Sequence, residues 1–382
     1  MKKIMILAVA AIAMVGCTKT YEVVETSQEQ SPIGFGTWTE NMTKAESRVQ
    51  GTGTFLSGDT FNVYGYKTVS ATPANVFTGD VVTAKGASEQ DGLTVTSWTY
   101  SPLRFWDATA SSYTFFAVSP SGKVATAPTA DQTGEYTGLF VSNPIVFGGH
   151  DNDVLVATKK VVEAAVGTPK YANTPVEIQF NHVASLIDVK VKKDVALPAG
   201  ATLQITAASF TGVQNKGTFT VSSYDGSNKP VIGATTYGWV IHGESVATAY
   251  SSNASLPLNV SGATTEYDGE THVGTTTGTP QDLFSNFILM PQDLSTGAQK
   301  LHLEYKIITQ ADPEISTSFT ANVDIKDFVV SDKDNNSAAA VSTSWNPTTH
   351  YTYTVTIGAN AITFTASIND WTNATGYNYL IN

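Results

Sequence analysis

The stretch from Val176 to Val191 constrains the fold most, because it is the longest run in which apolar and polar residues alternate. Up to Leu186 the mainly apolar set has even numbers, and from Ile187 onward the apolar residues have odd numbers. Side chains of a strand point to opposite faces in turn, so a one-residue change of phase moves the buried set to the other face. A β-bulge or a bend between two sheets would cause this change. We therefore predict a strand whose two parts pack in different environments and which begins a second domain.

The rest of the chain repeats short strand patterns separated by turn residues, which indicates an all-β protein. The clearest hairpin has alternating runs at 351–357 and 362–368 around a turn at 358–360. No long window away from the N-terminus has the apolar spacing of a helix, and only 159–166 has the pattern of a brief one. The 382 residues are enough for two domains, and we predict antiparallel β-sandwiches.

The charge balance argues against two classes of partner. The net charge is −12, and only 14% of the residues are charged. Nucleic acids and anionic membranes are bound through clustered Lys and Arg, so neither is an expected partner of the folded part. Hydrophobic residues make up 41% of the chain, which is enough for sizeable cores.

The N-terminus has the form of a bacterial lipoprotein signal. Lys2 and Lys3 precede an apolar run at 4–15 that is too short to be a spanning helix. Gly16 and Cys17 follow, and Cys17 is the only cysteine of the chain. A small residue before a cysteine at this distance resembles a lipobox, although Met14 stands where Leu is usual. The alternative is an ordinary signal peptide cut elsewhere. We favour removal of residues 1–16 and acylation of Cys17, because the single cysteine lies where lipidation requires it.

The next segment combines a weak strand with an exposed linker. Residues 18–32 are polar and are expected to form a flexible tether. In the strand pattern that runs from Ile33 to Trp38, Ile33 and Phe35 share one face. The two glycines within it weaken a strand by about 0.5–1 kcal/mol each relative to Ala, so the strand could pair with a sheet and yet be removable. Residues 41–53 are polar and rich in turn residues, which favours exposure and proteolysis.

Metal and nucleophile motifs are weak or incomplete in this sequence. The six histidines are too far apart in the chain to form a local metal-binding pair. We interpret His182, on the apolar face of the central stretch, as a hydrogen-bonded core residue and residues 150–153 as a turn. Residues 332–336 resemble the start of a calcium loop, but Ser337 replaces the required Gly and Thr343 the required Glu. No G-x-S-x-G or phosphate-binding G-x-x-x-x-G-K motif is present. We expect no catalytic residue, no metal and no cofactor.

Two further possibilities remain open at this stage. A carboxylate pair for glycoside hydrolysis is a spatial arrangement that one sequence does not reveal. Four aromatic residues could stack on sugar rings, although core filling is the better interpretation for nearly all of them. They are Trp98, Phe105, Trp106 and Trp239.

A series of short motifs, in chain order, resembles the fimbrillin family of Bacteroidota surface lipoproteins. The motifs are the lipobox cysteine, GDTFNVY at 58–64, FW at 105–106 with YTFFAVSP at 113–120, DVLVA at 153–157, FNHVASL at 180–186, LMPQ at 289–292, and Trp345 with YTYTVTI at 351–357. Each motif alone is weak. The ordered set covers nearly the whole chain and is fairly specific to the family.

The resemblance implies a fold and a route of assembly. The fold would be two tandem transthyretin-like antiparallel β-sandwich domains at 49–174 and 175–382, after a signal peptide at 1–16 and a lipidated tether with a removable strand at 17–48. An arginine-specific protease at the outer membrane would cut between Arg48 and Val49. The strand that is removed would carry Ile33, Phe35 and Trp38. A strand of the next subunit would then fill the vacated groove by β-augmentation. The possible donor residues are Ile362, Phe364, Ala366 and Ile368.

Three functions follow from these patterns, in order of preference. The first is a structural, non-enzymatic subunit precursor of a cell-surface fimbria, whose partners are other subunits, the protease and the outer membrane. The second is a surface-anchored tip adhesin or glycan-binding lipoprotein with host or bacterial ligands. The third is a hydrolase of surface polysaccharide, which requires two facing carboxylates.

Overall fold

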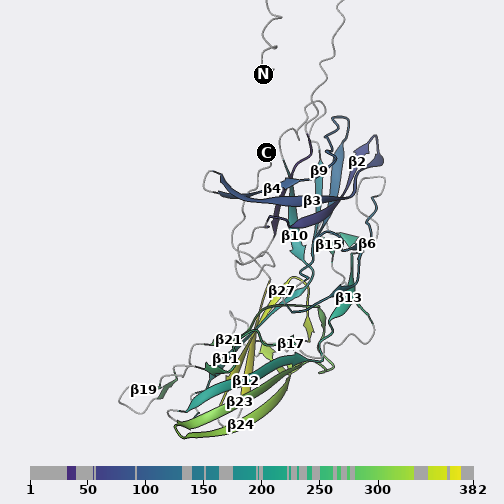
Figure 1. The fold of residues 1–382 in the computed structure, drawn as a ribbon. Helices are drawn as coiled ribbons and strands as arrows, with labels where there is room; N and C mark the ends of the chain where they lie inside the picture. The colour runs from purple at the N-terminus through teal and green to yellow at the C-terminus, as the bar shows by residue number, and fades with distance from the viewer. Residues whose placement is uncertain are drawn as a thin grey trace, which may run out of the picture. The chain divides into compact units, whose positions relative to one another are not determined.

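The computed structural model describes most of the chain from Pro32 to Asp370, and every described residue belongs to the unit Ser31–Asn382. The described residues are 32–39, 55, 57–90, 93–130, 140–149, 152–162, 175–194, 197, 201–221, 223–224, 230–231, 239–242, 250–260, 265–267, 273–275, 280–330, 343–358 and 362–370. Their regular structure is strand, apart from one short 3-10 turn at Ile325–Asp327 (Figure 1). The predicted all-β class is confirmed. Among these residues no helix could span a membrane.

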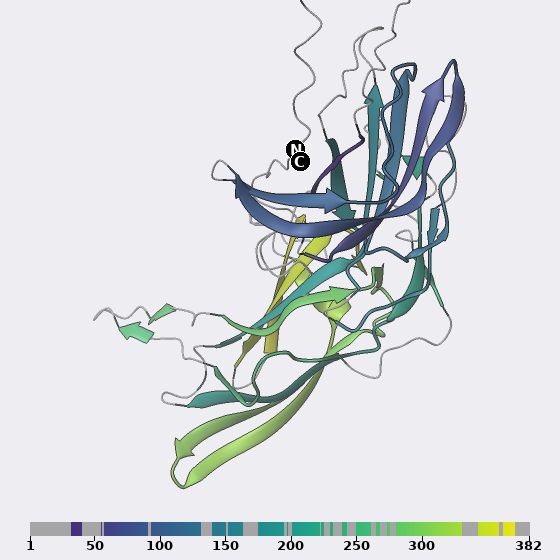
Figure 2. The ribbon, with the colours of Figure 1, turned by 45° about the horizontal axis from the view of Figure 1, so that its top comes forward.

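A seven-stranded sheet contains most of the N-terminal half. Its order is β1 (Phe35–Thr39), β10 (Val176–His182), β9 (Leu155–Val162), β5 (Ser112–Ser119), β2 (Thr60–Val69), β3 (Thr72–Gln90) and β4 (Leu93–Thr99). Strand β3 pairs with β2 along its first part and with β4 along its second (Figure 2). The brief helix expected at 159–166 is wrong for its described part, because β9 continues to Val162 in register with β5.

The central strand β5 is buried on both faces, which explains its nearly continuous apolar sequence. Phe115 and Ala117 belong to an aromatic-rich core on one side. Phe116 and Val118 belong to a second core on the other side, together with residues of a small sheet. That sheet joins segments distant in sequence: β6 (Val124–Thr126), β7 (Phe140–Ser142), β8 (Ile145–Val146), β13 (Lys216–Val221) and β16 (Trp239–Ile241).

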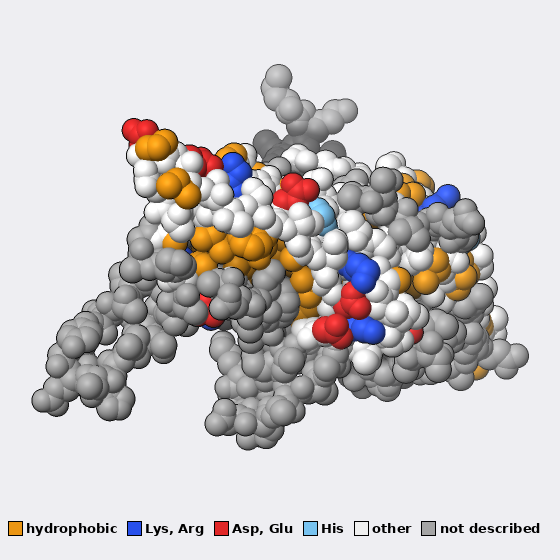
Figure 3. Space-filling model, turned by 90° about the horizontal axis from the view of Figure 1, so that it is seen from below, with side chains coloured by type: hydrophobic (Ala, Val, Ile, Leu, Met, Phe, Trp, Pro, Cys, Tyr) orange, Lys and Arg blue, Asp and Glu red, His pale blue; other side chains and the backbone are white. Residues whose placement is uncertain are grey.

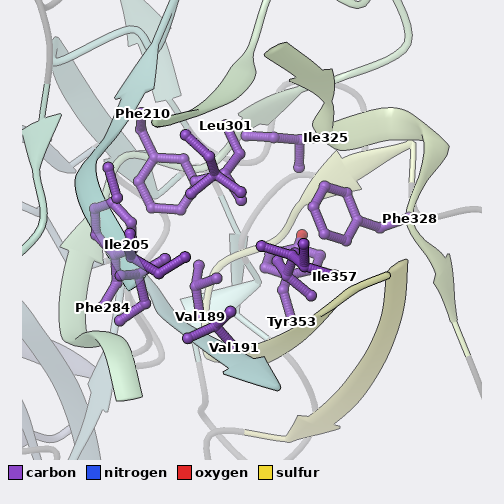
Figure 4. Close-up of a cluster of buried hydrophobic side chains, with 14 of the residues drawn as sticks. Val189, Val191, Ile205, Phe210, Phe284, Leu301, Ile325, Phe328, Tyr353 and Ile357 are labelled. Carbon is purple, nitrogen blue, oxygen red and sulfur yellow. The ribbon is translucent and has the colours of Figure 1, made fainter. Parts of the chain in front are cut away.

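Two further sheets form a sandwich in the C-terminal half. The first has the order β21 (Gln281–Leu289), β11 (Ser185–Lys193), β27 (Thr349–Ile357), β28 (Ile362–Asp370) and β25 (Val329–Val330). The second has the order β17 (Tyr250–Ser251), β12 (Thr202–Thr211), β23 (Lys300–Ala311) and β24 (Glu314–Asp324), with β18 (Leu258–Val260) beside β12. Figure 4 shows the core between them, where Val189 and Val191 of β11 lie with Phe210 and Phe284.

Three two-stranded pairs complete the described strands. They are β14 (Ser223–Tyr224) with β15 (Pro230–Val231), β19 (Thr265–Tyr267) with β20 (Val273–Thr275), and β22 (Gln292–Asp293) with β26 (Ser344–Trp345). Most strand pairs are antiparallel, as the sequence predicts. Among the described pairs, β1–β10, β11–β27 and β25–β28 are parallel, which the local sequence pattern did not indicate.

The change of phase in the central stretch is a bend between two sheets, one of the two causes that the sequence suggested. The stretch forms two strands, β10 in the seven-stranded sheet and β11 in the C-terminal sandwich. Between them the Val183 amide donates to the Val154 carbonyl, and the Val183 carbonyl accepts from the Trp239 indole at 2.8 Å. Both backbone groups of Val183 are therefore hydrogen-bonded although the bend is buried. The domain limit at 174/175 stays a prediction.

Candidate functional site: the N-terminal strand

Strand β1 lies at an edge of the seven-stranded sheet, and among the described strands its one partner is β10. The pairing is parallel, and Phe35 is opposite Val176 while Thr39 is opposite Phe180. The Val176 amide donates to the Gly34 carbonyl at 2.8 Å at the start of this ladder. An edge strand of five residues shares few hydrogen bonds with its sheet, so side-chain packing must supply much of the free energy that keeps it in place.

The side chain of Phe35 supplies that packing. It is fully buried, and Ile33 beside it is 1% exposed. The Phe35 ring meets four other rings, mostly edge to face, at centroid distances of 5.5–6.0 Å; they belong to Phe61, Phe77, Tyr100 and Phe115. Burying one aromatic side chain is worth about 1.5–3 kcal/mol, and favourable ring pairs add to this. We call these four rings the aromatic cluster.

The loop at 100–106 contacts residues 32–33, which come just before β1. The Ile33 amide donates to the Arg104 carbonyl at 2.8 Å, and the Tyr100 hydroxyl donates to the Ile33 carbonyl at 2.6 Å. Pro32 forms a β-bridge with Phe105. Burial is the main cause that raises the pKa of Tyr100 above its usual value, which keeps the hydroxyl protonated as a donor.

The residues predicted for processing fall in different parts of the chain. Ile33 and Phe35 are buried as just described, whereas for Trp38 the structure describes only the backbone, opposite Gln179. Cys17, Arg48 and Val49 lie outside the described residues.

The segment predicted as a donor lies in a different sheet from β1. Ile362, Phe364, Ala366 and Ile368 belong to β28, which pairs with β27 on one side and β25 on the other. Within this chain the structure therefore does not bring the two segments together.

No sequence pattern singled out the residues around β1. Of Tyr100, Phe61 and Phe77, only Phe61 lies in one of the motifs, and nothing local indicated that these rings meet Phe35. Gly65 was also unremarked, although a Cβ there would lie 2.9 Å from the Phe77 ring. The composition offered one signal for Arg104: the chain has only two arginines, and the other is Arg48.

Other groups with chemical potential have structural explanations. His182 is buried and its Nδ1 lies 2.9 Å from Asp153 Oδ1, which confirms it as a hydrogen-bonded core residue. Trp98, Trp106 and Trp239 are also buried, and only Phe105 of the four candidate stacking residues is well exposed. Within the described ranges no cluster of three His, Cys, Asp or Glu residues could hold a metal ion. On the face in Figure 3, basic and acidic side chains lie side by side.

Comparisons with known proteins agree with this architecture. No curated protein matches the chain. A solved fimbrial protein from Bacteroides vulgatus has a TM-score of 0.52 at 19% identity, covering 89% of this chain and 99% of that one. A candidate cell adhesion protein from Bacteroides uniformis has a TM-score of 0.46 at 14% identity, covering 89% and 98%. The model of the fimbrillin-like family matches residues 43–371. This chain therefore belongs to the fimbrillin-like family.

Proposed function

We propose that the chain is the precursor of a cell-surface fimbrial subunit, which assembles by losing β1 and accepting a strand from the next subunit. The observation that carries this proposal is the construction of β1. It is a short edge strand held by one ladder, by the buried Phe35 ring and by the bonds of Ile33 to the 100–106 loop, and Arg48 follows it in the chain. The names of the solved fimbrial and cell adhesion proteins are consistent with this role.

Loss of β1 would create a binding site for another strand. The edge of β10 would present unpaired N–H and C=O groups, and the place of Phe35 within the aromatic cluster would be empty. Backbone hydrogen bonds would supply affinity and the aromatic cluster would supply specificity, as in β-augmentation. While β1 is in place it covers this edge, which protects the precursor from premature association. Acylated Cys17 and the tether at 18–32 would hold the precursor at the outer membrane until the cut.

The donor segment offers the matching side chains. Ile362 and Phe364 are separated by one residue, as are Ile33 and Phe35. A donated β28 could therefore place isoleucine and phenylalanine where β1 had them. It would first have to leave β27 and β25 of its own subunit, so donation carries a cost that burial in the new site must offset.

Arginine-specific proteolysis of the full chain tests this proposal. We expect one cut, after Arg48, followed by ladders of multimers that resist detergent on a gel. Arg48→Gln should remain an uncut monomer, and a cut after Arg104 is recognisable by mass. Phe364→Asp should be cut normally but give only short products with the wild type, because it would accept a strand but not donate one.

A cut protein that stays monomeric would contradict assembly by strand exchange. If that monomer also binds a glycan or a host protein saturably, and loses this binding in Phe105→Ala, the adhesin is the better function.

A further inference from the structure

We propose that the 100–106 loop is the second wall of the strand-binding site and that the Tyr100 hydroxyl positions whichever strand occupies it. The inference rests on the proposed function and names the partner chemistry of that site. The ligand is an extended peptide with a bulky aromatic residue at the Phe35 position and an aliphatic residue two positions before it. The loop binds its backbone and the aromatic cluster binds its aromatic side chain.

The two walls hold different atoms of the same short segment. On the β10 side, the Gly34 carbonyl accepts from Val176. On the loop side, the amide and carbonyl of Ile33 bond to the Arg104 carbonyl and the Tyr100 hydroxyl, respectively. These loop contacts involve only the backbone of Ile33. They are therefore available to any incoming strand in the same register, whatever its sequence.

The loop is held by contacts that do not depend on β1. The Tyr100 ring packs against Phe77 at a centroid distance of 5.3 Å. The Arg104 guanidinium forms an ion pair with Asp80 at 3.2 Å, and the Asp80 side chain is only 11% exposed. The Arg104 amide also lies 3.3 Å from the Tyr100 hydroxyl oxygen. A site whose donors and acceptors stay in place when the strand leaves loses less entropy when the next strand binds.

A competition experiment tests the loop wall from the ligand side. The full chain is cut after Arg48, and a labelled peptide of residues 31–39 is exchanged into the vacated site. An unlabelled peptide in which the Ile33 amide is replaced by an ester lacks the N–H that bonds to Arg104. A buried neutral hydrogen bond is worth about 0.5–1.5 kcal/mol, so we expect the ester to compete about three- to tenfold more weakly. The protein is unchanged in this comparison, so folding defects do not interfere.

The matching protein variant is Tyr100→Phe, which keeps the ring and removes the hydroxyl. We expect the labelled peptide to leave it about three- to tenfold faster than the wild type. The control is Tyr66→Phe, which removes a hydroxyl that donates to the Pro128 carbonyl at 3.3 Å, away from β1. Equal competition by the two peptides, or equal release from Tyr100→Phe and wild type, would overturn the inference.

The proposed function and the loop wall can fail separately. If the strand never exchanges from the cut wild-type chain, the proposed function is wrong. Hydrogen exchange at the Ile33 amide of the uncut chain then decides about the loop. The loop wall requires slow exchange there in the wild type and faster exchange in Tyr100→Phe, and an unchanged rate would contradict it.

Discussion

Strand β1 has five residues and one neighbouring strand, whereas β28 has nine residues and lies between two. All nine residues of β28 are in antiparallel register with β27, and β25 adds a short parallel pairing on the other side. Strand β1 instead depends on Phe35 and the 100–106 loop. The difference teaches that β1 can leave the edge of its sheet by breaking one ladder, whereas β28 must break pairings on both of its sides.

The largest expected effect is at the side chain that holds β1. Phe35→Ala should lower the free energy of unfolding by about 3–5 kcal/mol, because the ring is fully buried within the aromatic cluster and leaves a cavity. Denaturant unfolding of the uncut chain measures this loss. Phe105→Ala is the matched control: Phe105 is 44% exposed, and we expect a loss below about 1 kcal/mol. Equal losses would mean that Phe35 does not hold β1.

A smaller effect is expected at the strand that pairs with β28. Tyr353 of β27 accepts a hydrogen bond from the Trp345 indole at 2.8 Å, and burial, the main cause, raises the pKa of Tyr353 well above its usual value. Tyr353→Phe leaves the buried indole N–H without this acceptor, so we expect a loss of about 1–3 kcal/mol in denaturant unfolding. Tyr305→Phe, also in this core, is the control and should cost less.

Tyr353→Phe can also be made in the protein cut after Arg48, which tests whether the regions around β1 and β28 are independent. Tyr353 and Phe35 belong to different core clusters. Distant sites contribute independently, so the cost of Tyr353→Phe should be the same with β1 present or removed. A cost that changes after the cut would show that the two regions are coupled.

Hydrogen exchange compares the two strands directly. Amides bonded within the β27–β28 ladder should exchange at least about tenfold more slowly than those in the β1–β10 ladder, equivalent to about 1.4 kcal/mol in opening free energy. The reason is that β1 can open alone at its edge. Equal protection would mean that both strands open only with the whole unit, and removal of β1 would then require global unfolding.

The sequence indicated local structure well because side-chain alternation has a fixed period of two. The hairpin of β27 and β28 could be predicted from that period, and so could the change of phase between β10 and β11, although a bulge and a bend both remained open as its cause. Strand β5, which contains the YTFFAVS part of the motif at 113–120, has a short apolar run that ends at turn residues, as is typical of a strand buried on both faces.

Pairing between distant segments could not be predicted in the same way. Strand β13 lies between β16 on one side and β7 and β8 on the other, and no local pattern specifies such neighbours. The parallel register of β1 with β10 joins segments far apart in the chain. The sequence therefore predicted one part of the candidate site, the weak strand that carries an aromatic residue. The loop wall was not predicted, because the bonds from Tyr100 and Arg104 go to the backbone of Ile33, and backbone groups carry no sequence signal.

The smallest predicted effect concerns the carboxylate that follows the 100–106 loop. Asp107 Oδ2 lies 2.5 Å from Lys67 Nζ, and Thr109 donates to Oδ1 from its amide and its hydroxyl. The hydrogen bond from Lys67, followed by those from Thr109, lowers the pKa of Asp107 from 3.8 to about 2. Because the folded pKa lies below the unfolded one, this stabilisation is complete above about pH 4 and is lost as the pH falls toward 2.

Solvent screening of this partly exposed pair reduces its contribution to about 1 kcal/mol. Asp107→Asn should therefore unfold at lower denaturant than the wild type at pH 7, and the difference should shrink as the pH falls from 4 to 3. Asp282→Asn, which removes the more exposed partner of Lys190, is the control and should cost a few tenths of a kcal/mol, about the size of a surface pair. A deficit in Asp107→Asn that does not shrink at low pH would assign the effect to the shape of the turn rather than to its charge. The loop beside β1 would then be held by packing and by the Arg104–Asp80 ion pair rather than by the charge of Asp107.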